Sequence, residues 1–385
     1  MNVAVGKSYQ PDAVNEWELP GRIPDKPSGS AYGFMTNWHE VVECSDAEEL
    51  VSKVIQRGVK RIKFVWTPET PKPVYPETVP TLVIAFQKQA AADARKAIYW
   101  GAGLLAFGTI LALAFHNWQL LYRNLLAMIG AFVLIAGAYE LYRARNYTQE
   151  DAESAASSER FGTWLKAKRI TGYTFAIASC IVMVGVAQLI AGDKESIDAA
   201  GLVKPAVWQG QWWRLFTCTL MHVNFTHFWM NFLALLQFAR IVEQTIQRAY
   251  MPLIFLLSAI CGSLFSLLLY PNTTSVGASG GLMGLLGFLT VSVFVERDKY
   301  PPKFLKRLIE SIGFVVVLGI VGFALIDNAA HLGGLCGGAF LGWVFLKHRN
   351  TGAARISSAR LHLLGIISLI FIVLIALTAV LQMLK

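Results

Sequence analysis

The hydrophobic positions divide the chain into two parts of different character. Residues 1–96 mix apolar and polar positions as soluble proteins do, whereas from residue 97 onward long apolar runs alternate with short basic loops. A helix needs about 20 mostly apolar residues to cross the hydrocarbon layer of a membrane. Runs of this kind predict nine membrane spans, at residues 97–115, 124–142, 172–192, 215–239, 252–270, 279–296, 311–326, 331–346 and 361–384. The larger part of the chain is therefore predicted to be an all-α polytopic membrane protein.

A small α/β element is predicted before the first span, at about residues 38–88. Residues 1–38 carry Pro and Gly at intervals with little periodicity, which indicates loose order. Ser45 and Glu48 have the spacing of a capping box, so a helix is predicted to begin there and to end near Gly58.

Two strands are expected to complete this element. Arg61 to Trp66 and Thr81 to Phe86 are rich in apolar and β-branched residues, and a proline-rich turn separates them. No catalytic constellation is visible in the region 1–96, and the sequence identifies no partner for it. We interpret it as a small cytoplasmic binding or regulatory module.

Basic residues in the loops predict the orientation of the spans. Seventeen Lys and Arg residues lie in the loops 143–170, 240–251, 297–310 and 347–360, whereas five lie on the opposite side. Positively charged loops are retained on the cytoplasmic side. The N-terminus is therefore predicted to be cytoplasmic and the C-terminus external, and the expected location is the plasma (inner) membrane.

These patterns together predict five segments along the chain. They are the soluble region 1–96, two additional spans in 97–142, a cytoplasmic linker 143–170, a core 171–348, and a basic loop with a final span in 349–385.

Composition favours a membrane protein over a nucleic-acid-binding one. Only 15% of the residues are charged, against roughly a quarter in soluble proteins. The net charge of +9 does not gather into a basic patch with interleaved aromatic residues, so no nucleic-acid partner is expected. Five scattered cysteines without a C-x-x-C pair predict neither a disulfide framework nor a zinc site.

A candidate nucleophile begins one of the apolar helices. Ser279 lies in the sequence Gly277-Ala278-Ser279-Gly280, directly after an uncharged external loop. Unpaired N–H groups and the helix dipole favour a developing negative charge at a helix N-terminus, which suits a nucleophile whose reaction generates an oxyanion. The alternative is a serine that only caps the helix beside packing glycines.

A histidine is predicted at the same membrane depth. His331 begins the second helix after that of Ser279. This helix also runs inward from the external face. Gly280 and Gly284 lie one turn apart on the first helix, as do Gly334 and Gly338 on the second. Small residues four apart let helix backbones approach closely, which would bring the serine hydroxyl within hydrogen-bond reach of the imidazole. The alternative is a histidine that only bonds to a neighbouring helix.

A third group of polar residues lies near the external end of the span 215–239. His227 and Asn231 are four residues apart and so share one helix face, from which both side chains can donate hydrogen bonds to a tetrahedral intermediate. A metal site is the alternative for His222 and His227. Two histidines five apart without an adjacent carboxylate do not match the H-E-x-x-H arrangement of zinc proteases, so neither a metal nor a cofactor is expected.

Four motifs, which follow one another along the chain in the order typical of the family, resemble the rhomboid family of intramembrane serine proteases. They are residues 277–280, residues 327–334, the set His222, His227 and Asn231, and the pair Trp213-Arg214. The resemblance covers roughly residues 170–348 and implies a six-helix core. The chain departs from the family outside this core, where the apolar runs predict two additional spans before it (97–115 and 124–142) and one after it (361–384).

The resemblance implies a role for each matching residue. Ser279 would be the nucleophile and His331 the general base, with Asp327 unassigned because residues 327–330 need not be helical. His227 and Asn231 would form the oxyanion hole with the Ser279 N–H, and His222 would be structural. Trp213 and Arg214 would lie in the first external loop. Four glycines would lie near the site: Gly277 and Gly280 beside the nucleophile, and Gly334 and Gly338 as packing residues beside the base.

The resemblance also implies the reaction, which is hydrolysis of peptide bonds in or near transmembrane segments of other membrane proteins. Two other readings stay open at this point. A non-catalytic rhomboid-like scaffold would bind client transmembrane helices without cutting them. A transporter would also place polar residues within the membrane, but the sequence has no convincing internal repeat.

Overall fold

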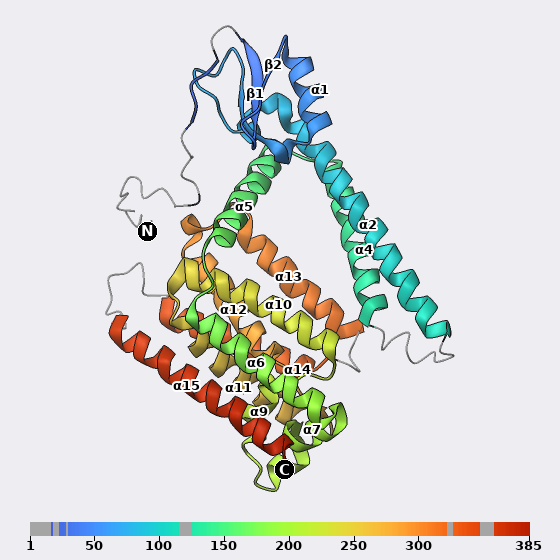
Figure 1. Ribbon diagram of the computed structural model, residues 1–385, viewed down its shortest axis with the longest axis vertical. Coiled ribbons are helices and arrows are strands. Elements are labelled where there is room, and N and C mark those ends of the chain that lie inside the picture. The colour runs from blue at the N-terminus through green and yellow to red at the C-terminus, as the bar shows by residue number, and fades with distance from the viewer. Residues whose placement is uncertain (1–16, 18–22, 28–29, 115–124, 322–325, 347–357) are drawn as a thin grey trace, which may run out of the picture. The chain divides into compact units, whose positions relative to one another are not determined.

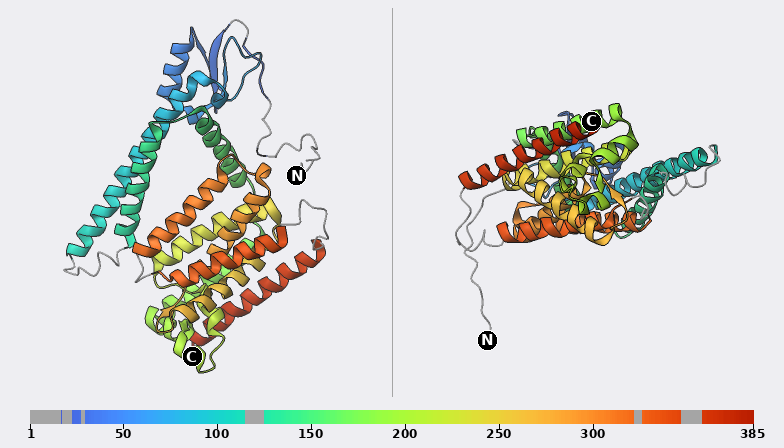
Figure 2. Two further views of the ribbon diagram at one scale, coloured as in Figure 1. Left: turned by 180° about the vertical axis from the view of Figure 1, so that it is seen from behind. Right: turned by 90° about the horizontal axis from the view of Figure 1, so that it is seen from below.

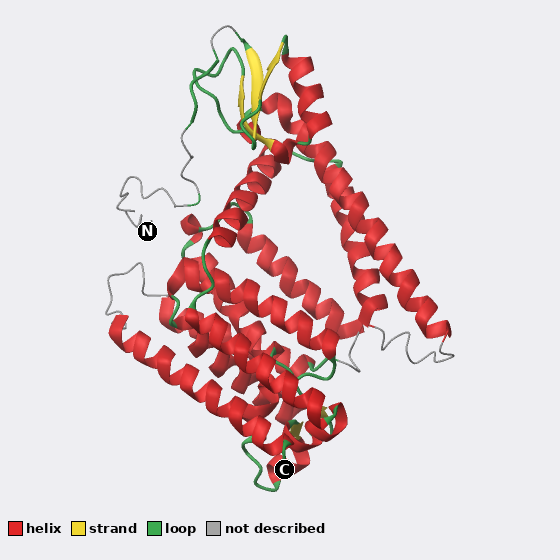
Figure 3. Cartoon of the chain, viewed as in Figure 1, coloured by secondary structure: helices red, strands yellow, loops and turns green. Residues whose placement is uncertain are grey.

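The structure is a computed structural model that describes residues 17, 23–27, 30–114, 125–321, 326–346 and 358–385. Helices make up most of the described chain, with a small group of strands near the N-terminus (Figure 3). The chain divides into two compact units, one of Met1–Leu111 with Ile129–Trp164 and the other of Ala112–Met128 with Leu165–Lys385. The five-segment division expected from the sequence stays a prediction.

The first unit contains a three-stranded antiparallel sheet in the order β2-β1-β3 (Figure 1). Its strands are β1 (Tyr32–Thr36), β2 (Val41–Cys44) and β3 (Ile62–Trp66). The expected loose order of residues 1–38 is wrong for β1. Gly33 lets this strand lie directly against the buried Trp66, because a Cβ at Gly33 would lie only 2.4 Å from the Trp66 Cζ2.

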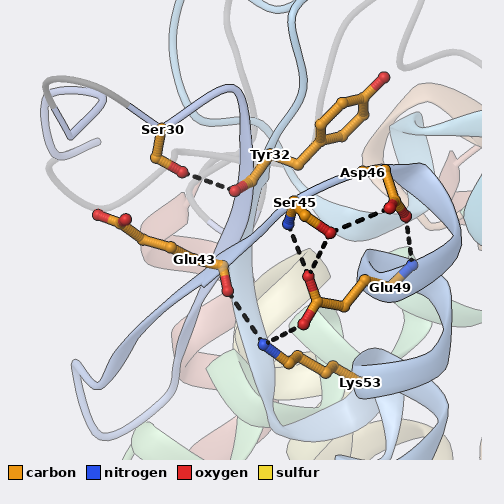
Figure 4. Close-up of polar contacts among 7 residues, drawn as sticks. All are labelled: Ser30, Tyr32, Glu43, Ser45, Asp46, Glu49 and Lys53. Carbon is orange, nitrogen blue, oxygen red and sulfur yellow. Dashed lines mark hydrogen bonds and ion pairs between the residues drawn. The ribbon is translucent and has the colours of Figure 1, made fainter.

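Helix α1 (Ala47–Arg57) begins one capping position later than the sequence predicted. Asp46 is the N-cap, and its carboxylate accepts a hydrogen bond of 2.8 Å from the Glu49 N–H. Glu49 in turn accepts from the backbone N–H of Ser45 at 2.6 Å (Figure 4). The N-cap is therefore Asp46 instead of Ser45, because aspartate caps at least as well as serine, and Glu49 instead of Glu48 reaches back to the residue before the cap. Gly58 ends the helix with a positive φ of 84°.

The predicted strand Thr81–Phe86 is wrong. These residues form a 3₁₀ turn, η3 (Pro80–Leu82), and the start of α2 (Val83–Ala114). The buried Leu82 and Ala85 are three residues apart, which is a helical spacing, and the next residues are rich in Ala, Gln and Lys. The apolar run was too short to distinguish a strand from a helix by its pattern alone.

Two further helices belong to the same part of the chain. They are α4 (Leu125–Ala144) and α5 (Gln149–Ala167), so most of the predicted cytoplasmic linker is helical. Helix α4 packs closely on α2, since a Cβ at Gly101 would lie 2.3 Å from the backbone nitrogen of Leu134.

The second unit is a bundle of helices (Figures 1 and 2). Its longer helices are α6 (Gly172–Ala191), α10 (Phe225–Val242), α11 (Tyr250–Leu269), α12 (Ser279–Val295), α13 (Phe304–Val321), α14 (Asn328–Leu346) and α15 (Ser358–Met383). Helices α11, α12 and α14 pack against one another at its centre, and α15 lies along α6 and α11. At that last contact a Cβ on Gly365 would lie 2.8 Å from the Ala249 carbonyl oxygen.

Short elements fill the connection between α6 and α10. They are α7 (Asp193–Ala200), β4 (Leu202–Val203), α8 (Lys204–Trp208), α9 (Arg214–Thr217) and the 3₁₀ turn η4 (Cys218–Leu220). The single span predicted at 215–239 is therefore interrupted, and only its later part is the helix α10. Strand β4 pairs with β5 (Thr274–Ser275), which leads into α12. On the opposite side of the bundle, the π-helix η5 (Glu243–Gln247) extends α10 and the 3₁₀ turn η6 (Arg297–Lys299) follows α12.

Four of the described helices are long and apolar enough to cross a membrane, at Gly172–Ala191, Tyr250–Leu269, Asn328–Leu346 and Ala359–Met383. Helix α12 is also apolar but has 17 residues. The predicted all-α polytopic membrane fold is confirmed, and each of the nine predicted spans contains a helix among the described residues. The exact count of nine crossings stays a prediction.

We expect the start of α1 to lose protection as the pH falls. Contacts with Lys53 and Ser45 lower the pKa of Glu49 to about 2 from its ordinary value of 4.5. A carboxylate with a lowered pKa stabilises the fold above its unfolded pKa, and the contribution is lost as the pH falls from 4.5 toward about 2. Hydrogen exchange of the α1 peptide, corrected for intrinsic rates, should be faster at about pH 3 than at about pH 6.

Two variants make this test specific. Glu49→Gln should exchange faster than the wild type already at neutral pH, because the charged contact to Lys53 is gone. Glu48→Gln is the matched control, since it removes a carboxylate from the same first turn without breaking the cap. Equal exchange in both variants would contradict the proposed role of Glu49 in stabilising the start of α1.

Candidate active site

Ser279 is the first residue of α12, and the backbone before it has a conformation that favours glycine. Gly277 has a φ of 145°, and its N–H donates a hydrogen bond of 2.9 Å to the Cys218 carbonyl. A Cβ at Gly277 would lie 3.5 Å from the Ser279 Oγ and 2.9 Å from Cε1 of His227. The absence of a side chain at Gly277 therefore lets the serine hydroxyl and this imidazole approach the same small space.

Helices α12 and α14 touch through their backbones along a row of glycines. A Cβ at Gly334 would lie 2.1 Å from the Gly280 carbonyl oxygen, and one at Gly338 would lie 1.9 Å from that of Gly284. We call these four residues the glycine seam. One helical turn nearer the start of α14, a Cβ at Gly280 would lie 3.6 Å from the carbonyl oxygen of Ala330. The residue after Ser279 thus lies beside the residue before His331.

The side chains of Ser279 and His331 are both partly buried in this region. Among the residues that the structure describes, no hydrogen bond joins them, and the buried Nδ1 of His331 has no partner. Bonds between a nucleophile and its base are often long in free enzymes and tighten when substrate binds.

Helix α10 presents the other two predicted polar residues. Asn224 caps the helix by accepting a hydrogen bond of 2.9 Å from the His227 N–H. Asn231 is buried and donates from Nδ2 to the His227 carbonyl at 2.9 Å. An amide nitrogen carries two N–H groups, so Asn231 keeps a second donor.

His222 is a packing partner of His227. The two rings meet edge to face with centroids 5.2 Å apart. Both ring nitrogens of His222 are buried and have no hydrogen-bond partner among the described residues. The Gln188 side chain holds its backbone on both sides, by accepting from the N–H and donating to the carbonyl, each at 2.9 Å. The sequence analysis missed Gln188, although a glutamine within an apolar span was a signal that it needs a polar partner.

Arg214 organises the connection between α6 and α10. It is buried, stacks on Trp213 at 4.6 Å, and donates to the carbonyls of Gly201 at 2.8 Å and Asp198 at 2.9 Å. Its Nε also donates to Gln211 at 2.6 Å. These contacts tie Trp213 and Arg214 to the loop itself.

Asp327 directly precedes α14, which begins at Asn328. Its carboxylate accepts a hydrogen bond of 2.9 Å from the Ala330 N–H. The expectation that residues 327–330 need not be helical is wrong for residues 328–330. No hydrogen bond joins the carboxylate to the ring of His331 within the described part of the chain.

Comparison with known proteins identifies the family. The family model described as "Rhomboid domain" matches residues 209–348. The "Putative rhomboid protease YdcA" of Bacillus subtilis (strain 168) is 31% identical over 141 residues, which cover 36% of this chain and 70% of that protein. The chain belongs to the rhomboid family. Its described helices and small N-terminal sheet agree with the predicted fold, and it is an integral multi-pass membrane protein.

Other rhomboid relatives match a smaller share of their length. The rhomboid protease GluP of Bacillus subtilis (strain 168) is 34% identical over 170 residues, which cover 43% of this chain and 32% of GluP. RHOMBOID-like protein 1 of Arabidopsis thaliana is 39% identical over 136 residues, 35% of this chain and 34% of the relative. The chain thus spans about a third of the length of these two relatives.

We expect the glycine seam to tolerate no added methyl group. In Gly334→Ala the new Cβ would lie 2.1 Å from a backbone oxygen, so α12 and α14 must move apart. Overpacking of this kind should lower the Tm of the purified protein by roughly 2 to 10 °C. Thermal unfolding in detergent, followed by the reactivity of newly exposed cysteines, measures the change.

Gly313→Ala is the matched control, because Gly313 is also helical and a Cβ there meets no atom within 4 Å. This variant should keep or raise the Tm, since alanine favours a helix over glycine. An equal Tm for the two variants would show that the seam is loose.

Proposed function

We propose that this rhomboid protein is a serine endopeptidase that hydrolyses peptide bonds in or near transmembrane segments of other membrane proteins. Ser279 is the nucleophile and His331 the general base. The observation that carries the proposal is the glycine seam, because it packs the turn that begins at Ser279 against the turn that carries His331. The names of YdcA and GluP as rhomboid proteases support the same reaction.

The reaction proceeds through an acyl-enzyme. His331 takes the proton of the Ser279 hydroxyl as Oγ attacks the scissile carbonyl, and it returns this proton to the leaving amine. Water then attacks the ester by the same route in reverse, and the serine is released. Asp327 accepts from the Ala330 N–H, and no bond from its carboxylate to the imidazole is present in the described part of the chain, so this scheme uses a dyad.

In this proposal, three donors stabilise the charge on the tetrahedral intermediate. The Ser279 N–H belongs to the first turn of α12, where backbone donors are unpaired and the helix dipole favours an anion. His227 and the second N–H of Asn231 supply the remaining donors. Support for His227 comes from its ring, which flanks the same space beside Gly277 as the Ser279 Oγ.

Transmembrane segments of other proteins are the proposed substrates. A helix hides its peptide bonds in its own hydrogen bonds, so it must unwind locally before Oγ can reach a carbonyl. Glycine and other small residues weaken a helix and should therefore mark preferred substrates. The excess of Lys and Arg in the loops on one side supports a site on the external side and a cytoplasmic N-terminus. We propose the plasma (inner) membrane as the location.

The alternative function is a non-catalytic scaffold that binds client transmembrane helices. Names such as RHOMBOID-like protein 1, which do not mention a protease, favour this alternative. The presence of both dyad residues beside the glycine seam weighs against it. A serine-reactive probe distinguishes the two functions, because only an activated Ser279 should be labelled.

Ser279→Ala should abolish cleavage of a single-span substrate while leaving the Tm unchanged. The reason is that alanine removes the attacking atom and little volume. Purified protein in liposomes, incubated with candidate substrates, gives the products, and mass spectrometry locates the cut. Ser292→Ala is the matched control from the same helix, and it should still cleave. Cleavage by the Ser279 variant would refute the assignment of the nucleophile.

His227→Ala and Asn231→Ala should each lower kcat by about 10²- to 10³-fold if each removes one oxyanion donor. The measurement is the initial cleavage rate at saturating substrate in the same liposomes. Since Asn231 also bonds to the His227 carbonyl, the Tm of both variants should be recorded. A wild-type kcat in either variant would remove that residue from the oxyanion hole.

A further inference from the structure

A row of polar side chains connects the first external loop to the start of α14. At one end, the side chain of Lys204 is fully buried. Its ammonium donates hydrogen bonds of 2.6 Å to the Thr273 Oγ1 and 3.1 Å to the Ser275 Oγ. A buried cation is costly unless an anion compensates it, so the row should lead to a negative charge.

That negative charge is the carboxylate of Asp327. The hydroxyl oxygens of Ser275 and Ser266 are 3.2 Å apart, and Ser266 donates a hydrogen bond to the Asp327 Oδ2. Burial lowers the pKa of Lys204 and the charge of Asp327 opposes this shift, as expected for two compensating charges.

The direction of each hydrogen bond follows from the number of protons. A serine hydroxyl has one proton, and Ser266 uses its proton to donate a hydrogen bond to Asp327. The proton between the two serines must therefore come from Ser275, whose oxygen is left to accept from Lys204. All donors point from the ammonium toward the carboxylate. We call Lys204, Ser275, Ser266 and Asp327 the polar relay.

The relay reaches both halves of the proposed dyad. Asp327 lies four residues before His331, accepts from the Ala330 N–H at 2.9 Å, and receives the His331 backbone N–H on its carbonyl at 3.1 Å. Ser275 lies four residues before Ser279, in the strand β5 that leads into α12. The same hydrogen bonds thus connect the segment before the nucleophile to the turn that carries the base.

We infer that the polar relay aligns His331 with Ser279, and that Asp327 is a positioning residue for the general base. This inference rests on the proposed protease function. Asp327 acts through the backbone of the first turn of α14 and does not touch the reacting atoms. Lys204 compensates the negative charge of Asp327 in this partly buried position, and the carboxylate holds the turn through the Ala330 N–H.

The test compares kcat and KM of variants that leave the dyad intact. Asp327→Ala removes the cap and the charge, and Asp327→Asn removes the charge alone. Misplacement of a catalytic group should lower kcat on the order of 10- to 100-fold for Asp327→Ala, with KM changed by less than about threefold. Asp327→Asn should recover part of this loss, since asparagine also caps helices.

Asp46→Ala is the matched control, because Asp46 caps α1 through the same third N–H at 2.8 Å, in the first unit. It should keep the wild-type kcat. A purely structural role for Asp327 would lower the Tm and leave kcat at the wild-type value in the folded fraction, which would overturn the inference.

A double variant tests the coupling of the two charges. Lys204→Met and Asp327→Asn each leave one charge without its counterpart, whereas the double variant removes both. The double variant should therefore lose less activity than the product of the two single losses. Losses that multiply would show that Lys204 and Asp327 act separately, and the relay would be refuted.

The wild-type protein separates failure of the relay from failure of the function. If the wild type cleaves its substrate and the Asp327 variants cleave equally fast, the relay is wrong and the protease function stands. If the wild type neither cleaves a substrate nor reacts with a serine-directed probe, the protease function fails and the inference fails with it.

Discussion

The backbone contact between α12 and α14 is the interaction on which the rest of the site depends. Lipid tails are as apolar as leucine, so helices in a membrane associate through close packing more than through hydrophobic burial. Gly334 and Gly338 bring one helix to the carbonyl oxygens of Gly280 and Gly284, where any side chain would collide. This contact sets the register of the two helices. Once the register is set, Ser279 and His331 lie in adjoining turns without any direct bond between them.

Much of this arrangement was predictable because it repeats at the period of a helix. Glycines four residues apart and apolar runs of membrane length are visible in the sequence, and both correspond to helices in the structure. Two predictions, the N-cap of α1 and the strand at Thr81, were wrong because two local structures fit the same residues equally well. Asp46 and Ser45 are both good caps one residue apart, and the short run at Thr81 fits a strand as well as the helix that α2 forms.

The polar relay could not be predicted in this way. Its members lie far apart in the sequence, and each has a common explanation when considered alone: Lys204 is a loop charge, Ser266 a small residue in an apolar helix, and Asp327 an ordinary cap. Only the folded chain brings their side chains within hydrogen-bond distance. The sequence signal that remained was an aspartate directly before an apolar helix, which indicates a cap but not the buried cation opposite it.

Helix α15 bears on the route by which transmembrane segments could reach the site from within the membrane. Helix α15 lies along α6 and α11, and its Gly365 approaches the backbone of Ala249 closely. Under the proposed protease function, with substrates that diffuse sideways through the bilayer, α15 would cover the flank formed by α6 and α11. Arriving segments must then dock on a flank that α15 leaves open. Removing α15 would thus widen the range of directions from which a substrate can enter, without altering a single residue of the dyad.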